Sequence, residues 1–581
     1  MAKKHTEGTV DRVAKQQATK TKQTNQPVEV VPLVNVQQAV PKSWVVWLER
    51  LRANVGTPTF AKVYVAFALL ALLITTLLWA LLGAKVHLGN ADQLVNSFLF
   101  EHVSTFRDAT LPGQHTFLFK WPLFLLVKLV GLTPGAFTVA TVAAVLVTVF
   151  LLVLVLYRIE RRPLVFGTLC LALSLALLMV PAQPYAGALL PVNMAMLTTR
   201  NLEYVLYIVA LVLFVRAPRV RSGKFWVAVG LMAVLIASDK LFLSIGAGAA
   251  LLALFMYVFA RRWDLATASA NWLLGMVVSG AAAVALLWAV NAAGITHIAG
   301  QTNAGPYGFV HSSHGFVLGA VYAVLGVLTN VGANPAFDAR TLGQLPHTAI
   351  GHLRGGGFAY LMTLAIAAAG TLAAAVLVRR SLVRRATDAI DTDSPSKLSL
   401  MMIWTTIAAC GAFVASNHYY MVDARYLAIA LFTIFICLAT AGRRLQWPAQ
   451  WLAGIGAVIT LSLAVGTGVA VHTYHDEQAA LAALNKRDAV VAHVLAQHHV
   501  KVLVGDYWRV IPSRLAANNK LNVMPLETCT QARQILSSKA WQPELKANGF
   551  AYLLSLDLHT TDYPSCDLKQ IVNTYGRPNA S

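Results

Sequence analysis

Apolar runs of eighteen or more residues recur along the chain, and they constrain its fold more than any other feature. A run of that length crosses the hydrocarbon layer of a bilayer, about 30 Å thick, as a helix. Of the 581 residues, 57% are hydrophobic and 12% are charged, about half the charged fraction of a soluble globular protein. The sequence therefore predicts a mainly α, polytopic transmembrane helical protein.

Eleven spanning helices are predicted, at 63–86, 136–157, 163–181, 201–215, 225–238, 241–260, 271–294, 357–378, 398–416, 427–441 and 449–471. They define a transmembrane module over residues 63–471, in which two connections, 87–135 and 295–356, are long. Each connection contains an apolar segment, 119–132 in the first and 316–331 in the second. Both segments are predicted to be juxtamembrane helices rather than additional spans.

Basic residues predict the orientation. The formal net charge is +21, and most Lys and Arg stand in short clusters beside apolar runs, such as Arg158 to Arg162 and Arg443 with Arg444. Loops with an excess of Lys and Arg stay in the cytoplasm. The N-terminus and all these clusters are therefore expected inside, and the two long connections and residues 472–581 outside. Topology explains the basicity, so no nucleic-acid partner is predicted.

The two ends of the chain differ in character from the module. Residues 1–42 lack periodicity and predict a disordered cytoplasmic tail, and residues 43–62 predict an interfacial helix with Trp44 and Trp47 at the lipid headgroups. The first apolar run follows about sixty residues, which favours a signal anchor over a cleaved signal peptide.

Residues 472–581 predict a small extracytoplasmic α/β domain. Its strands are expected at 501–505, 521–526 and 550–555, and its helices at 476–499, 513–518, 530–537 and 568–574. Cys529 and Cys566 would form a disulfide in an oxidising compartment and remain thiols in the cytoplasm. Tyr507 and Trp508 either stack on a sugar or pack in the core.

The first long connection concentrates ionisable groups at a membrane boundary. It contains Asp92-Gln93 just after the first span and Lys120-Trp121-Pro122-Leu123 before the second. This order resembles the GT-C superfamily of integral membrane glycosyltransferases, especially the protein mannosyltransferase and aminoarabinose transferase branch. Those enzymes have an acidic pair early in the first external loop and a Lys/His-Pro-Pro-Leu-like segment before the second span. The motif-level resemblance covers chiefly residues 60–160.

The resemblance implies transfer of a sugar from a polyprenyl-phosphate donor to an extracytoplasmic glycan, lipid or protein acceptor. Asp92 would be the catalytic base, and Lys120 would hold the carrier phosphate. Gln93 stands where family members commonly have a second carboxylate, which weakens the case for a divalent metal; a metal cofactor stays open but is not supported by the sequence. From the residues alone, each has an alternative role. Asp92 can be a solvated helix cap, and Lys120 can be a membrane anchor whose ammonium reaches the lipid headgroups.

Five further residues on the same predicted side are candidate substrate-binding groups: Arg200, Glu203, Asp239, Arg425 and Tyr426. Simpler roles compete with binding, because Arg200 can pair with Glu203 three residues along a helix. Arg425 can likewise pair with Asp423. His311 and His314 lack a third ligand at a diagnostic spacing for a metal.

Two other classes of function remain open. A multi-pass transporter or lipid flippase is expected to place charges inside its spans, where this sequence has few. A non-catalytic scaffold that presents the C-terminal domain to envelope polymers is the other alternative.

Overall fold

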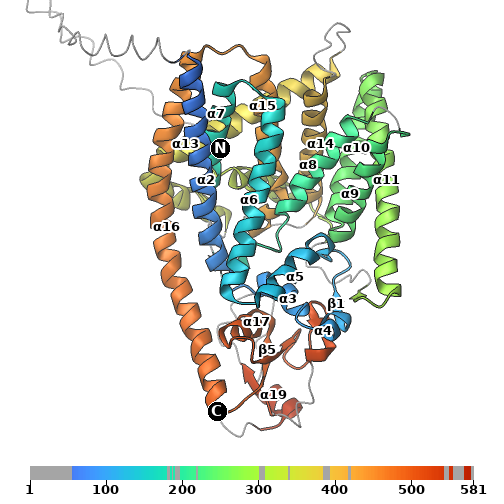
Figure 1. Cartoon of the computed structure of the whole chain (residues 1–581), viewed down its shortest axis with the longest axis vertical. Helices are drawn as coiled ribbons and strands as arrows, with labels where there is room; N and C mark the ends of the chain where they lie inside the picture. The colour runs from blue at the N-terminus through green and yellow to red at the C-terminus, as the bar shows by residue number, and fades with distance from the viewer. Residues whose placement is uncertain are drawn as a thin grey trace, which may run out of the picture. The chain divides into compact units, whose positions relative to one another are not determined.

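Long apolar helices make up most of the structure, a computed structural model (Figure 1). It describes residues 55, 57–179, 184–185, 188–189, 196–217, 220–299, 308–337, 341–383, 393–416, 421–541, 549–553 and 568–577. The predicted tail 1–42 and most of the predicted interfacial helix lie outside the described residues. Residues 58–62, which that prediction included, belong to the first long helix.

Within the described ranges, nine helices are long and apolar enough to cross a membrane. These are α2 (Pro58–His87), α6 (Pro134–Ile159), α10 (Leu241–Phe259), α11 (Trp263–Ala292), α12 (Ser313–Asn330), α13 (Leu345–Leu382), α14 (Ser394–Ala415), α15 (Ile429–Arg444) with the preceding η4 (Met421–Leu427), and α16 (Ala449–Gln497). Three shorter apolar helices are α7 (Pro163–Met179), α8 (Asn201–Val215) and α9 (Gly223–Ser238). The chain is therefore a multi-pass helical membrane protein.

Local sequence sets several helix ends. Thr57 and Thr133 each cap a helix, accepting a hydrogen bond from the backbone N–H three residues on, and a proline follows each of them. A threonine cap with proline in the first turn is a strong start signal, because proline lacks only an N–H that would have had no helical partner.

The second long connection contains α12, at the segment predicted to be juxtamembrane. Val310, just before α12, donates its backbone N–H to the Ala415 carbonyl at 3.0 Å. At the other end, the Asn330 amide donates to the Ala424 carbonyl at 2.6 Å. The two ends of α12 therefore contact Ala415 and Ala424. The helix is also long and apolar enough to be a span, so its juxtamembrane position stays a prediction.

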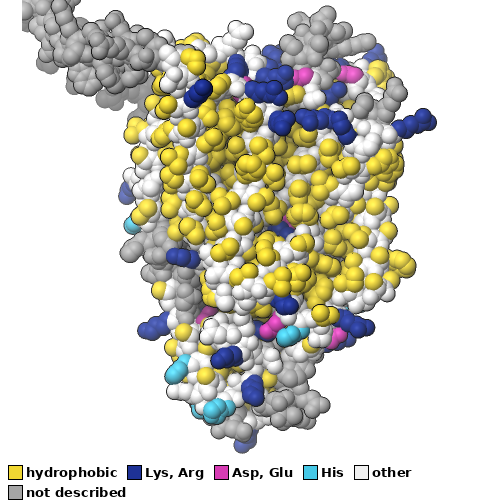
Figure 2. Space-filling model, in the orientation of Figure 1, with side chains coloured by type: hydrophobic (Ala, Val, Ile, Leu, Met, Phe, Trp, Pro, Cys, Tyr) yellow, Lys and Arg dark blue, Asp and Glu magenta, His cyan; other side chains and the backbone are white. Residues whose placement is uncertain are grey.

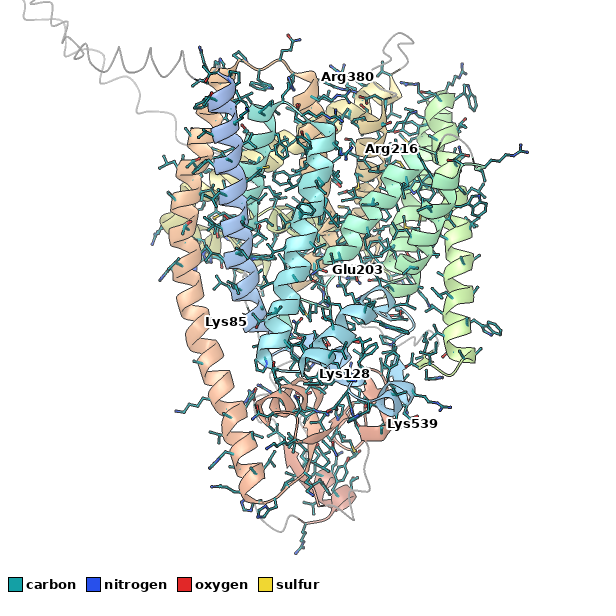
Figure 3. All side chains as sticks on the ribbon, in the orientation of Figure 1. Lys85, Lys128, Glu203, Arg216, Arg380 and Lys539 are labelled. Atoms are coloured by element: carbon teal, nitrogen blue, oxygen red, sulfur yellow. The ribbon has the colours of Figure 1, made fainter. Side chains whose placement is uncertain are left out.

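Figure 2 shows a row of basic side chains along the upper end of the helical bundle and further basic side chains scattered in the lower half of the molecule. Arg162 donates to the Leu445 carbonyl at 2.8 Å, and Arg262 donates to the Ser381 carbonyl at 3.0 Å. These bonds join clusters that are far apart in sequence, and Figure 3 shows Arg216 toward the same end. The gathering agrees with the pattern on which the predicted orientation depends.

The last long helix differs from its prediction. The sequence suggested a span that ends at residue 471 and a separate polar helix from Asp476, but α16 is continuous over 49 residues. At 1.5 Å per residue it is about 74 Å long, more than twice the thickness of the hydrocarbon layer. Figure 1 shows its C-terminal part continuing past the ends of α2 and α6.

Beyond α16 lies a parallel three-stranded sheet in the order β6-β5-β8, formed by β5 (Val502–Asp506), β6 (Asn522–Leu526) and β8 (Ala551–Leu553). In chain order, α17 (Tyr507–Ala516) follows β5 and α19 (Leu568–Tyr575) comes after β8. The three strands fall where they were predicted, but the predicted helix at 530–537 is wrong. That segment is bent, and its backbone bonds elsewhere: Arg533 N–H donates to the Pro525 carbonyl, and Leu536 N–H donates to the Thr110 carbonyl.

The first long connection folds into α3 (Ala91–Leu99), α4 (Val103–Arg107), β1 (Ala109–Leu111), η1 (Leu118–Lys120) and α5 (Trp121–Val130). Strand β1 is central in a second sheet, with β4 (His297–Ile298) on one side and β7 (Ser537–Ser538) on the other. The two long connections and the C-terminal region thus share one sheet. The remaining short elements are β2 (Pro184–Tyr185), β3 (Ala188–Leu189), η2 (Leu342–Gln344) and η5 (Lys539–Trp541).

The cysteines divide as their positions suggested. Cys170, Cys410 and Cys437, which lie in apolar helices, are free. Cys529 is disulfide-bonded, and Cys566 lies outside the described residues.

Candidate functional site

Asp92 stands in the first turn of α3, where Asn90 caps the helix by accepting the Asp92 backbone N–H at 2.9 Å. Its carboxylate accepts a hydrogen bond from the Tyr507 hydroxyl, with 2.8 Å between the two oxygens. The carboxylate also lines a cavity of about 190 Å³. Asp92 is therefore more than a solvated cap, because its side chain is held by the C-terminal region and the residue lines a cavity.

The cavity combines ionisable and apolar side chains. Its lining includes Asp92 from α3, His115 from the loop before η1, Arg200 from the segment before α8, and Arg425 and Tyr426 from η4. The apolar part of the lining includes Phe117, Met196, Leu431, Phe432 and Leu536. An amphipathic lining of this kind suits a ligand that has both an anionic group and a less polar part.

Gln93, the residue that departs from the family pattern, is fully buried. Its amide nitrogen donates to the Thr141 hydroxyl at 2.9 Å, and its amide oxygen accepts from the Leu197 backbone N–H at 2.7 Å. Gln93 therefore joins α3, α6 and the segment that carries Arg200. Its role here is to fix that segment beside Asp92.

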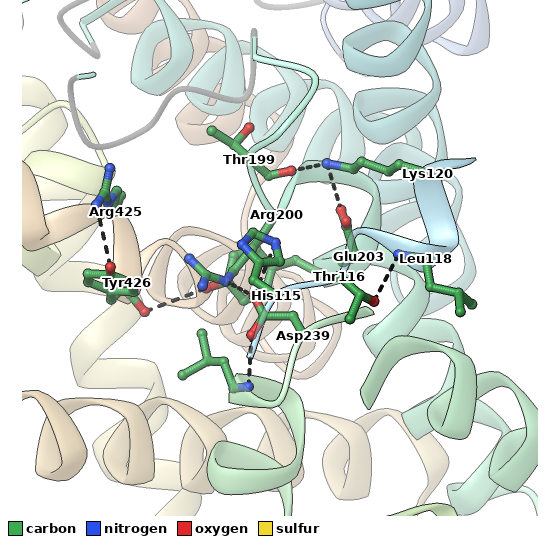
Figure 4. A network of polar contacts seen from close by, with 12 residues as sticks. His115, Thr116, Leu118, Lys120, Thr199, Arg200, Glu203, Asp239, Arg425 and Tyr426 are labelled. Atoms are coloured by element: carbon green, nitrogen blue, oxygen red, sulfur yellow. Dashed lines mark hydrogen bonds and ion pairs between the residues drawn. The ribbon is translucent and has the colours of Figure 1, made fainter. Parts of the chain in front are cut away.

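Arg200 pairs with Asp239, which lies between α9 and α10, through Nε and Oδ2 at 2.5 Å (Figure 4). His115 Nε2 lies 3.5 Å from the same Asp239 oxygen. Burial raises the pKa of Asp239, but the Arg200 guanidinium and the hydrogen bonds that the carboxylate accepts lower it, and the net pKa lies below its usual value. Asp239 is thus a buried anion that orients Arg200 and His115.

His115 is a neutral member of this group. Burial, opposed by Asp239 and reinforced by Arg200 and Lys120, lowers the pKa of His115 to about 3. The loop that carries His115 is anchored to the α9–α10 turn by three hydrogen bonds. The Thr116 hydroxyl donates to the Ala237 carbonyl at 2.6 Å, the Phe117 N–H to the Ser238 carbonyl at 3.2 Å, and the Lys240 N–H to the Gln114 carbonyl at 3.0 Å. The imidazole therefore adds no charge to the cavity at neutral pH.

Lys120 lies behind the cavity rather than in its lining. Its ammonium is 3.1 Å from a Glu203 carboxylate oxygen, and both side chains are 1% exposed. It also donates to the Thr199 carbonyl (Figure 4). Burial lowers the pKa of Lys120, while Glu203 raises it. This position favours a structural role for the pair over the predicted phosphate contact, and it excludes both the headgroup-facing lysine and the Arg200–Glu203 pair.

Arg425 and Tyr426 complete the cationic part of the lining. The Arg200 and Arg425 guanidinium carbons lie 5.1 Å and 5.2 Å from the centre of the Tyr426 ring. Both distances fall within the range of a cation–π contact. The Tyr426 ring therefore contacts both guanidinium groups, and two arginines that line one cavity suit an oxyanion such as a phosphate.

The predicted residues thus fall into two groups. Asp92, Arg200, Arg425 and Tyr426 line one cavity, while Lys120, Glu203 and Asp239 support it from behind. Sequence reasoning did not select His115, although it belongs to the ionisable residues concentrated in the first long connection. In the described part of the chain, no three His, Cys, Asp or Glu residues come together as metal ligands would.

Comparisons with known proteins add no assignment. No protein-family model, curated protein or solved structure matches the chain. Any statement about activity therefore depends on the site itself.

Proposed function

We propose that this chain is a membrane glycosyltransferase that moves a sugar from a polyprenyl-phosphate donor to an acceptor outside the cytoplasm. One observation carries the proposal: Asp92 lines the same amphipathic cavity as Arg200 and Arg425. A transfer of this kind needs a base for the acceptor and cations for the departing phosphate, close enough to act on one sugar. The resemblance of residues 60–160 to the GT-C superfamily supports the same reaction.

In the proposed reaction, the acceptor oxygen attacks the anomeric carbon of the donor sugar. The bond between that carbon and the phosphate oxygen breaks, and the lipid phosphate leaves with the electron pair. Asp92 takes the proton of the acceptor hydroxyl. Arg200 and Arg425 stabilise the charge that develops on the phosphate. A single displacement of this type inverts the configuration of the anomeric carbon.

Lys120, Glu203 and Asp239 act in this proposal through the residues that they position. Asp239 orients Arg200 and His115. The Lys120–Glu203 pair holds the Thr199 carbonyl next to Arg200, since Lys120 donates to that carbonyl. Without these contacts the lining residues would lose their fixed geometry.

We also propose that the chain lies in the cytoplasmic membrane with its basic end inside, and so with its N-terminus in the cytoplasm. The gathering of Arg162, Arg262 and their neighbours at one end of the bundle supports this orientation. The cavity and the C-terminal region are then extracytoplasmic.

The test uses purified protein, a panel of polyprenyl-phosphate sugars and a set of glycan, lipid and peptide acceptors. Asp92→Asn is expected to lower kcat on the order of 10²- to 10⁴-fold, because the amide cannot accept the proton. Asp108→Asn, an exposed acid of the same connection, serves as the matched control and retains native activity. Unchanged transfer by Asp92→Asn would remove Asp92 from the reaction, and no transfer from any donor would contradict the proposed function.

A further inference from the structure

Tyr507 is the residue through which the C-terminal region reaches the cavity. It is the first residue of α17, directly after β5, and it is completely buried. Its hydroxyl donates to Asp92 Oδ1 at 2.8 Å. The Arg533 guanidinium carbon lies over its ring at 4.1 Å, and the Trp508 ring packs edge-on with 5.1 Å between the ring centres. These contacts fix the direction of the hydroxyl.

The C-terminal region is joined to the first long connection at several other points. Arg514 on α17 forms an ion pair with Glu101, which follows α3. The Asn519 amide donates to the Leu132 carbonyl at 3.1 Å. Strand β7 pairs antiparallel with β1, and the Ser538 hydroxyl donates to the Thr105 carbonyl at 2.7 Å. The C-terminal region therefore contacts the first long connection at Glu101, Thr105, β1 and Leu132, in addition to the Tyr507–Asp92 hydrogen bond.

The same region also supplies part of the lining. Leu536, which precedes β7, lines the cavity and donates its backbone N–H to the Thr110 carbonyl of β1 at 2.9 Å. A cavity built only from the membrane helices and the first long connection would lack this side chain and the partner of Asp92. The site is thus incomplete without the C-terminal region.

We propose that Tyr507 is a positioning residue, and that the C-terminal region sets the orientation of the Asp92 carboxylate through it. This inference rests on the proposed function of Asp92 as the base. A carboxylate has two oxygens, and the Tyr507 hydroxyl occupies Oδ1. Oδ2 remains for the proton of the acceptor, and the bond to Oδ1 prevents the carboxylate from rotating away.

The kinetic test compares Tyr507→Phe with Tyr552→Phe. Both variants lose one buried or half-buried phenolic hydroxyl of the same region, but the Tyr552 hydroxyl donates to the Cys529 carbonyl at 2.9 Å instead of to Asp92. Tyr507→Phe is expected to lower kcat roughly 10- to 100-fold, the usual effect of a lost hydrogen bond to a charged group, with the donor KM unchanged. Tyr552→Phe is expected to retain the native kcat.

A second variant separates positioning from general damage. In the Asp92→Asn background, Tyr507→Phe is expected to cause no further loss, because residues that act as one unit are not additive. A full additional loss in the double variant, or a native kcat in Tyr507→Phe alone, would overturn the inference.

Hydrogen exchange supplies a readout that does not need activity. In Tyr507→Phe, the backbone amides of residues 91–99 are expected to exchange several-fold faster, since local opening of α3 has become easier; in Tyr552→Phe they keep the native rate. Unchanged exchange in Tyr507→Phe would overturn the inference. Failure of the proposed function gives a different result, namely no transfer by the native protein while the exchange rates still differ.

Discussion

The buried Lys120–Glu203 pair allows a sharp test of how the site is supported. In Lys120→Met, the Glu203 carboxylate loses the ammonium 3.1 Å away while remaining 1% exposed. Removing one member of a buried ion pair costs about 3–5 kcal/mol, because the other charge stays buried without compensation. Screening by solvent does not reduce this figure, since both side chains are equally buried.

Thermal unfolding in detergent measures the effect. With an unfolding entropy of about 2.1 cal/mol/K per residue, the cost corresponds to a fall in Tm of roughly 3–5 °C for a unit that extends over residues 55–581. Combining Lys120→Met with Glu203→Gln should restore part of the loss, because neither partner is then charged. Lys128→Met, a change of the same residue type on the neighbouring α5, should alter Tm by less than about 1 °C.

A second possible result would instead support the role that the sequence suggested for Lys120, which is contact with the donor phosphate. If Lys120→Met kept the native Tm and instead raised the donor KM, Lys120 would contact the substrate phosphate and the buried pair would be refuted. A fall in Tm without a change in donor KM supports the structural role.

Two further predictions concern pH and topology. The pKa of His115 is about 3 in the folded chain against 6.5 ordinarily, so below pH 6.5 the unfolded state takes up a proton that the folded state does not. Stability should fall as the pH decreases from about 6.5 to 3, and His115→Gln should reduce the slope of Tm against pH over that range; an identical slope would contradict the burial of His115. Reporter fusions at residues 220, 390 and 581 should report the cytoplasm, the cytoplasm and the outside; an external signal at 220 or 390 would reverse the proposed orientation.

The sequence predicted a helix best where the apolar pattern begins and ends at the same residues as the helix itself. Helix α8 has the bounds that were predicted, 201–215, since apolar residues fill it and polar residues flank it. Helix α13 begins at Leu345 instead of residue 357, and the predicted start falls next to the kink at Gly356, where polar character ended the apolar pattern. The continuity of α16 was missed for the same reason, because the apolar pattern ends near residue 471 while the helix continues through the polar residues that follow.

The sequence predicted which residues belong to the site better than it predicted which residues they contact. Asp92, Arg200 and Arg425 were selected as ionisable groups on one side of the membrane, and they line one cavity. Their partners depend on the tertiary fold. Tyr507 stands 415 residues after Asp92, and of its two suggested roles the structure favours core packing, with the hydroxyl directed at Asp92. No local pattern encodes a contact across such a separation.

The order of synthesis gives the β1–β7 pairing a consequence for assembly. Thr105, which lies in α4 just before β1, and Ser538 of β7 are bonded to each other and are 433 residues apart in sequence, so β1 is synthesised long before the strand that pairs with it. A product that stops before residue 536 leaves one edge of β1 open at the membrane surface, and open edges invite pairing with foreign chains. Such a truncated product is consequently expected to be prone to aggregation.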